Sequence, residues 1–551
     1  MSSFTFTDQQ KAAIIFNKSS IITACPGSGK TAVIQQKIIS TTKNSPNYQG
    51  VIAITFTKKA SEELKKRCTK NGNDTKLSFF GTIDSFCLTE IILPFLSRIW
   101  GGRPEDCKIV KKLSSDQMNY FKTDYKTPTY EDLRLDNGFK KLYENGILWM
   151  SSFAALSVLI LNESSSVRQY IKTRYTHVFI DEYQDSSRSQ HELFMKLFEL
   201  GLIATAVGDT DQSIYQFRGS DPKYLTKLIN DENFCHFELS VNHRCHPSII
   251  NYASRLINPK NELTLEKDIR VFRVTFKGDL RSAASQITNL IKELLIDKKI
   301  KNLSDIAVLG KKEKSLEEFS LNLGIENRLF IETPLINIGT ESAEIYSDLL
   351  QYKHNSILTA QEVIERYFWQ FESFKIQEVK QILKRIRTEN CLELFIENCN
   401  EILILLGYEN TATENAAVRD IWNNESLLKL FKPLSNNEVQ LMTLHKSKGL
   451  EFKIVFHIDL EEWSFPYRIP GKNWDDIIYP SLSEDTNLHY VGITRAVQYC
   501  ILVHTTQRKN ANDEYKNSRP SYFFNLTELD GLYKNIQHQE LKSYIGSNFT
   551  Y

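Results

Sequence analysis

Short apolar runs, separated by longer polar or helical stretches, are the main pattern along the chain. They are rich in β-branched and aromatic residues, and polar or helical sequence follows each of them. Runs of this kind are typical of parallel strands that are covered on both faces of a sheet. In the first half of the chain we predict such strands at residues 20–24, 51–56, 177–181, 204–209 and 237–240.

A second set of apolar runs follows much later, at residues 305–309, 439–444, 453–460 and 500–504. Two mostly helical stretches interrupt the two sets, over about residues 88–175 and 325–432, and residues 152–174 are the most amphipathic part of the first. Insertions of this length usually lie outside a sheet. The pattern therefore predicts an α/β chain with two parallel sheets, each with a helical insertion, and a ligand-binding cleft between them.

Composition fits a globular chain and argues against several classes of protein. Of the 551 residues, 41% are hydrophobic and 25% are charged, and 68 Lys and Arg stand against 67 Asp and Glu. This balance argues against a globally basic DNA-binding protein, although it is compatible with a local basic cleft. No apolar run approaches the ~18 residues that span a bilayer, and the amino terminus lacks the pattern of a signal peptide. Because the nine cysteines are scattered, we expect reduced thiols in a cytoplasmic protein that has no membrane partner.

The strongest chemical signal is a loop of small residues after the first predicted strand. It reads Ala24-Cys25-Pro26-Gly27-Ser28-Gly29-Lys30-Thr31 and opens a helical segment. Small residues let backbone N–H groups surround a phosphate, while Lys30 can reach the β- and γ-phosphates and Thr31 can hold magnesium. Ala24 stands where the general pattern has glycine, which leaves this mechanism intact. The loop is a P-loop and predicts a nucleotide site.

Two acids at the end of the third predicted strand fit the same chemistry. Asp181 and Glu182 follow the apolar run at residues 177–180. In P-loop enzymes the first acid of such a pair holds magnesium, and the second takes a proton from the attacking water. Without a P-loop upstream, an acidic pair at a strand end would more often be only solvated. With the P-loop present, we assign Asp181 to the metal and Glu182 to catalysis.

Further segments resemble the motifs of the superfamily-one DNA helicases of the UvrD, Rep and PcrA type. Residues 180–190 and 206–221 look like motifs II and III, and the P-loop looks like motif I. Six further segments resemble the remaining motifs in chain order: the Q motif (FTDQQKAAI, 6–14), Ia (AITFTKKASEELKKR, 53–67), Ib (GTIDSFC, 81–87), IV (LSVNHRCHPSII, 239–250), V (VQLMTLHKSKGLEFKIVF, 439–456) and VI (LHYVGITRA, 488–496). The resemblance covers roughly residues 1–320 and 430–530. It implies two RecA-like P-loop domains that use ATP and Mg²⁺.

The resemblance also implies contacts to the nucleotide outside the P-loop. Gln10 stands at the position that reads adenine in this family. His243 stands where the family usually has a tyrosine stacked on the base, so an altered base contact is expected. Glu451 would approach the ribose. These residues complete the cofactor-binding set together with the P-loop residues and two arginines.

The catalytic set implied by the resemblance comprises Lys30, Glu182, Gln212, Arg244 and Arg495. Gln212 would sense the γ-phosphate and couple it to the DNA site. Arg244 and Arg495 would come from the second sheet's side of the cleft, as arginine fingers that stabilise the charge of the transition state. Arginine suits this role because its planar guanidinium stays charged.

Aromatic residues in the same motifs are expected to contact DNA. Phe56, Tyr215 and Phe217 stand where the family places rings against single-strand bases, and such stacking is indifferent to base sequence. Thr82 and His445 are further expected DNA contacts. Without the motifs, core packing would be the more common role of a lone aromatic residue. The basic run at residues 58–70 is equally compatible with a phosphate track and with the solvated face of a helix.

The motifs and helical stretches together divide the chain. We expect a first RecA-like domain (1A) at residues 1–87 and 176–250, a helical insertion (1B) at 88–175, a second RecA-like domain (2A) at 251–324 and 433–530, a reduced helical insertion (2B) at 325–432, and a tail at 531–551. Full-length repair helicases of this type carry larger accessory domains. The chain is similar in size and general pattern to the GajB subunits of Gabija anti-phage systems, which act beside an OLD-family ATPase-nuclease, GajA.

Together these features predict an ATP-driven motor on single-stranded or tailed DNA. The resemblance implies 3′ to 5′ movement and a role in a defence complex with a GajA-like nuclease. The main alternative is a regulatory subunit that senses DNA or nucleotide, hydrolyses ATP and activates a partner nuclease, but unwinds little itself. The reduced insertions favour it, as does the run Glu484-Asp485-Thr486-Asn487, where the family commonly has Glu-Arg-Arg. An RNA helicase is a third reading, although motifs Ia and III look like those of DNA translocases.

Overall fold

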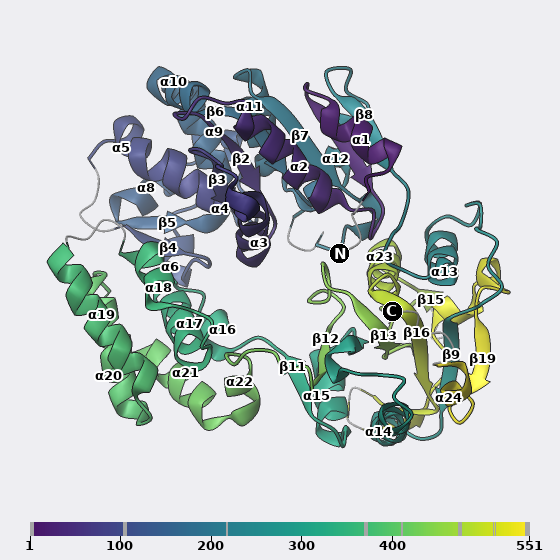
Figure 1. The fold of residues 1–551 in the computed structure, drawn as a ribbon. Coiled ribbons are helices and arrows are strands. Elements are labelled where there is room, and N and C mark those ends of the chain that lie inside the picture. The colour runs from purple at the N-terminus through teal and green to yellow at the C-terminus, as the bar shows by residue number, and fades with distance from the viewer. Residues whose placement is uncertain are drawn as a thin grey trace. The chain divides into compact units, whose positions relative to one another are not determined.

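The computed structural model describes residues 5–102, 107–215, 219–368, 373–408, 411–471, 477–510, 512 and 514–545. The chain forms two compact units, Met1–Cys245 and His246–Tyr551. Figure 1 traces both units from the purple N-terminal segment to the yellow C-terminal segment. Among the described residues, no helix is both long and apolar enough to cross a membrane.

The first unit is built on a parallel sheet of six strands in the order β3-β2-β6-β7-β1-β8. Every neighbouring pair is parallel. The strands are β1 (Ser20–Ala24), β2 (Gly50–Ile54), β3 (Phe79–Gly81), β6 (Tyr175–Ile180), β7 (Ile203–Gly208) and β8 (Cys235–Leu239). All five strands predicted in this half are present, and the short strand β3 extends the sheet.

Helices cover both faces of this sheet, because successive strand residues enter two different hydrophobic clusters. Ile22 belongs to the cluster that includes α1 (Asp8–Ile15), α2 (Lys30–Lys43) and α3 (Lys58–Thr69). Its neighbour Ile21 belongs to the cluster on the opposite face. That face packs α4 (Ile83–Phe86), a π-helix (Cys87–Ile92), α5 (Leu93–Trp100), α9 (Phe153–Glu163), α10 (Ser165–Arg174), α11 (Arg188–Glu199) and α12 (Lys223–Ile229).

The stretch between β3 and β6 also contains small elements whose residues belong to the same cluster as Ile21. They are β4 (Lys108–Val110), α6 (Ser115–Met118), α7 (Tyr130–Leu135), α8 (Gly138–Glu144) and β5 (Ile147–Trp149). The prediction of an amphipathic helix in this region was wrong for α9. Its residues from Phe153 to Leu161 are all buried, because α9 packs against α11, the π-helix and α7. A helix surrounded in this way is apolar on every side.

The second unit contains a parallel sheet of seven strands in the order β11-β12-β10-β13-β16-β9-β19. The strands are β9 (Val271–Phe276), β10 (Ile306–Gly310), β11 (Asn327–Phe330), β12 (Val439–Thr443), β13 (Phe452–His457), β16 (Ala496–Thr505) and β19 (Lys534–Gln537). The predicted α/β fold with two parallel sheets is therefore confirmed. Two short antiparallel pairs join β14 (Ile469–Pro470) to β15 (Ile477–Ile478) and β17 (Gln507–Lys509) to β18 (Tyr515–Asn517).

Helices also flank the second sheet. A hydrophobic cluster joins the sheet to α14 (Leu280–Ile296), α15 (Glu313–Asn322) and α24 (Leu541–Tyr544). Two further helices, α13 (Pro247–Ile257) and α23 (Leu482–Ile493), pack on each other and on β16. The second sheet is therefore covered by helices in the way that parallel sheets require.

A group of helices lies between β11 and β12 and has its own hydrophobic core. The group consists of α16 (Pro334–Ile338), α17 (Glu341–His354), α18 (Ala360–Tyr367), α19 (Ser373–Thr388), α20 (Leu392–Leu405), α21 (Ala412–Asn423) and α22 (Glu425–Lys429). These helices, in green in Figure 1, are called the helical insertion below.

Candidate functional site

The P-loop joins the carboxyl end of β1 to the first turn of α2. Gly27 and Gly29 have φ angles of 71° and 77°, a left-handed conformation that glycine adopts without steric cost. The Ser28 hydroxyl is buried and has no hydrogen-bond partner among the described residues. Backbone N–H groups at the start of a helix attract anions. The loop that contains Ala24, Cys25 and Pro26 thus has the form of a phosphate cradle.

Gln10 supports the P-loop from α1. Its side chain is buried, and its Nε2 donates a hydrogen bond to the carbonyl of Ser28 at 2.8 Å. Its Oε1 accepts the backbone N–H of Thr7, also at 2.8 Å, and closes a capping box at the start of α1. The residue expected to read adenine is therefore also a fixed part of the loop's support.

The segment after β8 packs directly on the P-loop. The N–H of His243 donates to the carbonyl of Gly27 at 3.0 Å, and a Cβ on Gly27 would lie 2.5 Å from the Cβ of Arg244. The expectation that Arg244 comes from the second sheet's side was wrong, because Arg244 belongs to the first unit. The reason is local: Asn242 Oδ1 accepts the N–H groups of Arg244 and Cys245, which turns the chain back across the loop.

The P-loop lysine lies against the two acids at the end of β6. Lys30 Nζ forms an ion pair with Glu182 and lies 4.0 Å from Asp181 Oδ1. Burial alone would lower the pKa of Lys30, but the charges of Glu182 and Asp181 outweigh it and raise this pKa to about 12. Glu182 has a φ of 57°, a strained backbone of the kind that collects at active sites.

A hydrogen-bonded chain continues from Glu182 to the end of β7. Gln184 Nε2 donates to Glu182 at 2.6 Å, and Gln184 Oε1 accepts the N–H of Asp209 at 3.0 Å. Gln212 Nε2 then donates to Asp209 Oδ2 at 2.7 Å. Burial, helped by the charge of Asp211, raises the pKa of Asp209 to about 6. The sequence did not single out Gln184 or Asp209, although both lie within the segments that resemble motifs II and III.

Thr31 and Asp181 fit a magnesium ion bound together with phosphates. Mg²⁺ prefers hard oxygen ligands and is usually held by one or two protein groups, with water and phosphate oxygens completing its shell. Thr31 supplies a hydroxyl next to Lys30, and Asp181 supplies a carboxylate 4.0 Å from the Lys30 ammonium. Among the described residues, no group of three or more His, Cys, Asp or Glu side chains could hold a metal alone. This donor set therefore suits a metal that arrives with a nucleotide.

A pocket of about 1080 Å³ opens beside these acids in the first unit. Phe56, Thr82 and Tyr215 line it, as do Asp181 and Glu182. The Phe56 and Tyr215 rings are stacked on each other, with centroids 4.8 Å apart and an angle of 22° between their planes. Expected DNA contacts and catalytic acids therefore share one pocket.

Lysines from the segment between β4 and α7 also line this pocket. They are Lys111, Lys112, Lys122 and Lys126. The sequence pattern did not single them out, because a lysine-rich stretch in a helical region has no distinctive spacing. Phe217, the remaining aromatic residue expected to contact DNA, lies outside the described residues.

The expected site residues of the second unit lie in the segments after β12 and α23. His445 follows β12 and is half-buried, and Glu451 directly precedes β13 and is exposed. Arg495 is buried and donates hydrogen bonds to the carbonyls of Val491 (3.0 Å) and Leu450 (3.2 Å). These contacts hold the segments resembling motifs V and VI together within this unit.

The run that departs from the family before motif VI has a structural role. Asp485 is buried, lies 2.5 Å from Lys311 Nζ, and accepts the N–H of Tyr467 at 2.7 Å. Asp485 therefore ties the start of α23 to the residue that follows β10. An arginine at this place would bring a second cation against the partly buried Lys311, which is electrostatically unfavourable.

Comparison with known proteins agrees with the motifs. The model of the UvrD/REP helicase N-terminal domain matches residues 6–118 and 106–233, and the model of the UvrD-like helicase C-terminal domain matches residues 339–507. Gabija protein GajB of Bacillus cereus (strain VD045) is 27% identical over 88% of this chain and 92% of its own length.

ATP-dependent DNA helicases are also similar to the chain. Rep of Buchnera aphidicola subsp. Schizaphis graminum is 25% identical over 95% of this chain and 96% of its own length. PcrA of Staphylococcus aureus (strain Mu50 / ATCC 700699) is 24% identical over 91% of this chain and 83% of its own length. The chain therefore belongs to the UvrD-like helicase family and is an enzyme of the ATP-dependent DNA helicase class.

Proposed function

We propose that this helicase moves along single-stranded DNA in the 3′ to 5′ direction and serves as the helicase subunit of an anti-phage defence complex. The observation that carries the motor part is the hydrogen-bonded chain from Lys30 through Glu182, Gln184 and Asp209 to Gln212. It joins the P-loop to the segment that leads to Tyr215 in the pocket. A change at the phosphate is thereby relayed to the DNA side.

In the ATP-bound enzyme, Lys30 would exchange its ion pair with Glu182 for the β- and γ-phosphates. This exchange leaves Glu182 free to accept a proton from the attacking water. Thr31 and Asp181 would hold Mg²⁺, which neutralises charge on the phosphate oxygens when it is bound. Arg244, next to the P-loop, and Arg495, from the second unit, are the proposed donors to the γ-phosphate as its charge develops.

On the DNA side, Phe56 and Tyr215 would stack on bases, while Lys111, Lys112, Lys122 and Lys126 would face the phosphates. In the structure the two rings stack on each other. A base that separated them would replace this one stacking contact with two, one on each ring. Lysines are suited to binding the DNA backbone, because their attraction to its phosphates does not depend on the base sequence. Thr82 and, from the second unit, His445 are proposed as further contacts. The proposed direction of movement is the one that the family resemblance implies.

The proposed defence role is supported by the similarity to GajB, which extends over most of both chains. A GajA-like nuclease of the OLD family is the proposed partner. The run around Asp485, which favoured a regulatory subunit, is accommodated within the fold by its contact with Lys311. A subunit that hydrolyses ATP to regulate the nuclease, with little unwinding of its own, remains the competing function.

The deciding experiment measures ATP hydrolysis by the purified chain with and without single-stranded DNA, for wild type and for Glu182→Gln. Glu63→Gln is the matched control, because Glu63 is an exposed carboxylate paired with Arg67 on α3. We expect DNA to stimulate hydrolysis in wild type and in the control, and hydrolysis to be lost in Glu182→Gln. Hydrolysis at the wild-type rate in Glu182→Gln would contradict the catalytic role of this acid.

Strand displacement from duplexes with a 3′ or a 5′ single-stranded tail then tests the motor. Displacement from the 3′-tailed duplex supports the proposal, and displacement only from the 5′-tailed duplex contradicts the direction. DNA-stimulated hydrolysis with no displacement supports the regulatory alternative. Addition of an OLD-family nuclease to the same reactions tests the defence role, and RNA as competitor tests the choice of nucleic acid.

A further inference from the structure

The helical insertion is a separately packed body that replaces a simple crossover in the second sheet. Its core consists of residues from α16 to α22 and the segments joining them. The chain leaves the sheet after β11 and returns to it at β12, and these strands are parallel neighbours, with Phe330 paired with Met442. The contacts made where the chain leaves β11 and where it returns to β12 determine how firmly the insertion is attached to the sheet.

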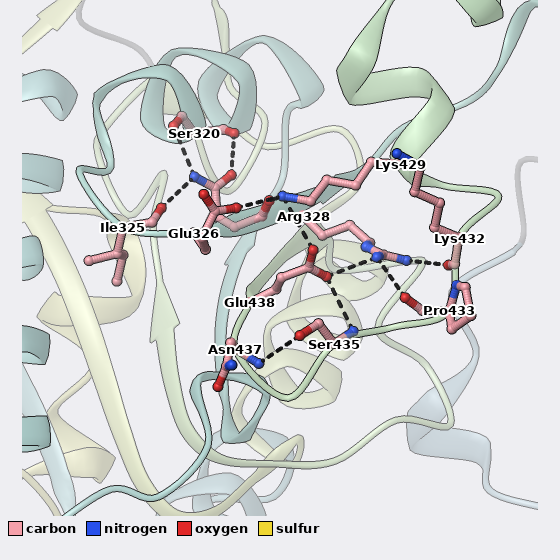
Figure 2. Close-up of polar contacts among 11 residues, drawn as sticks. Ser320, Ile325, Glu326, Arg328, Lys429, Lys432, Pro433, Ser435, Asn437 and Glu438 are labelled. Carbon is pink, nitrogen blue, oxygen red and sulfur yellow. Dashed lines mark hydrogen bonds and ion pairs between the residues drawn. The ribbon is translucent and has the colours of Figure 1, made fainter. Parts of the chain in front are cut away.

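A buried arginine in β11 holds the segment that returns from the insertion, as Figure 2 shows. Arg328, in β11, is 4% exposed. Its guanidinium donates to the carbonyls of Lys432 (2.7 Å) and Pro433 (2.9 Å) and lies 2.9 Å from Glu438 Oε2. One side chain in the departing strand thus holds the returning segment at three points.

A second cation reinforces the same junction. Lys429, the last residue of α22, donates to the carbonyl of Asn327 at 2.8 Å and lies within 3.3 Å of Glu438 and 3.0 Å of Glu326. Glu438 is buried and lies between the two cations, Arg328 of β11 and Lys429 of α22. We call Arg328, Lys429 and Glu438 the root clamp. A buried carboxylate shared in this way keeps its position only while both cations keep theirs.

The strand that follows Glu438 in the root clamp is the beginning of motif V. Glu438 directly precedes β12, which opens motif V (residues 439–456), and residues 443–451 are the part of motif V that runs from the end of β12 to β13. Lys446 reaches back from this segment, donating to the carbonyl of Phe330 at 3.2 Å and to Glu313 at 2.9 Å. Phe330 is the residue at which the chain departs for the insertion. Motif V is therefore fastened to the start of the helical insertion.

We propose that the root clamp and Lys446 couple the helical insertion to motif V, so that a force on the insertion changes ATP turnover. Arg328 is then a positioning residue for motif V, although it contacts neither DNA nor nucleotide in this role. Two parallel strands joined by backbone hydrogen bonds transmit a displacement at one end to the other, because such a pair cannot slip in register without exposing its buried faces. This inference rests on the proposed function, in which DNA stimulates hydrolysis.

The test uses the full-length chain with Arg328→Lys, which keeps the charge but loses the planar fork, and with Lys446→Met. Arg419→Lys is the matched control, because Arg419 pairs with Glu393 at 2.7 Å on the exposed surface of the insertion. Hydrogen exchange of the amides at residues 443–451 is measured without ligands. ATP turnover is measured with and without oligo-dT, together with the KM for ATP.

We expect faster exchange at residues 443–451 in Arg328→Lys and Lys446→Met, and wild-type exchange there in Arg419→Lys. The ratio of turnover with DNA to turnover without DNA should fall about fivefold or more in the first two variants, at the lower end of couplings between sites. Turnover without DNA and the KM for ATP should stay near wild type. Combining Arg328→Lys with Lys446→Met should add little, because both break one connection.

Unchanged exchange at residues 443–451 in both single variants would overturn the proposal, whatever the hydrolysis data show. Faster exchange with an unchanged stimulation ratio would also overturn it. If Arg328→Lys fails to fold, Lys446→Met decides alone, since its side chain is partly exposed. A wild-type chain that DNA does not stimulate would refute the proposed function, while the exchange data would still decide whether the clamp positions motif V.

Discussion

Gln184 is the side chain through which the end of β6 and the end of β7 meet. It is fully buried and uses both ends of its amide, one on Glu182 and the other on the N–H of Asp209. Gly208 leaves room for it, since a Cβ there would lie 2.5 Å from Gln184 Oε1. The orientation of Glu182 therefore depends on this buried amide as well as on the P-loop lysine.

Replacing Gln184 with Met tests this orientation, because Met has a similar length but cannot hold Glu182. We expect kcat for ATP to fall about tenfold to a hundredfold, as for other groups that orient a reacting residue, with little change in KM. Gln169→Met, at an exposed glutamine on α10, is the control. A Gln184→Met enzyme with wild-type kcat would show that Glu182 is oriented without it.

Gly27 tests the contact between the P-loop and the segment after β8. Gly27 has a φ of +71°, and a Cβ added to it would lie only 2.5 Å from Arg244 Cβ, so Gly27→Ala must displace one of the two segments. We expect loss of ATP binding, measured by calorimetry. Gly72→Ala is the control, because Gly72 has a φ of +75° and nothing within 4 Å. That control should lose only about 1–2 kcal/mol of stability and keep ATP affinity.

At the scale of single residues, the chemistry of the loop and of the strand end located the P-loop, Asp181 and Glu182 in the sequence, and the structure brings these together with Lys30. It did not locate Gln184, whose role depends on a hydrogen bond to a backbone N–H in another strand. Nor did it place Arg244 in the correct unit, because that depends on how the chain turns at Asn242. Residue types could be predicted from the sequence, but their partners across the sheet could not.

At the scale of elements, the carboxyl ends of the strands organise the first unit. The P-loop follows β1, Phe56 lies just after β2, Thr82 follows β3, and Asp181 follows β6. In parallel sheets, ligands bind outside this edge. Strand-to-helix turns thus bring nucleotide and DNA residues close together, although they are far apart in the sequence.

The stack of Phe56 on Tyr215 provides the test at this scale. Phe56→Ala should weaken binding of single-stranded DNA by about 1–3 kcal/mol, the contribution of one base stacked on an aromatic ring. Fluorescence anisotropy with labelled oligo-dT measures it. Tyr48→Ala is the control, since Tyr48 is exposed and does not line the pocket. Equal affinity of Phe56→Ala and wild type would remove Phe56 from the DNA site.

Except for the edge strand β8, the strands that the apolar pattern predicted lie inside the two sheets, and those that it missed have weaker signals. β3, β11 and β19 lie at sheet edges, where one side lacks a neighbour and polar residues are tolerated. β9 lies inside the sheet but includes Arg273, which is buried and donates to the carbonyl of Phe524 and the hydroxyl of Tyr252. A charged residue interrupts the apolar run by which a strand is predicted. Its burial could not be foreseen, because the partners that compensate its charge lie far away in the sequence.

At the scale of the whole molecule, burial of histidines makes stability depend on pH. Burial lowers the pKa of His457 to about 4, and burial with the nearby His457 and Arg273 lowers the pKa of His489 well below its usual value. In the unfolded chain both histidines have a pKa of about 6.5. Between these values the unfolded state binds more protons, so folding is favoured above about pH 6.5 and weakens as the pH falls toward 4.

Urea unfolding of the wild type therefore should show a lower midpoint at about pH 5 than at about pH 7.5. His457→Asn, which cannot titrate, should show a smaller difference between the two conditions. An equal midpoint at both values for the wild type would mean that other groups compensate. Intrinsic tryptophan fluorescence follows the transition.

The net charge of +1 says little about where charges gather. Lys111, Lys112, Lys122 and Lys126 line one pocket, while acids elsewhere balance them in the total. The overall fold class could be predicted because the apolar pattern reflects burial of whole strands. The grouping of lysines could not, because it arises only when a segment without regular spacing folds over the pocket.

The position of the helical insertion between β11 and β12 also determines where the chain can gain or lose residues without changing the sheet. Because β11 and β12 are parallel neighbours, the chain must cross from the end of one to the start of the other, and a crossover needs about a dozen residues or more. The helical insertion fills this obligatory connection. It can lengthen or shorten between Phe330 and Lys429 without altering the sheet, but it cannot be reduced to a tight turn.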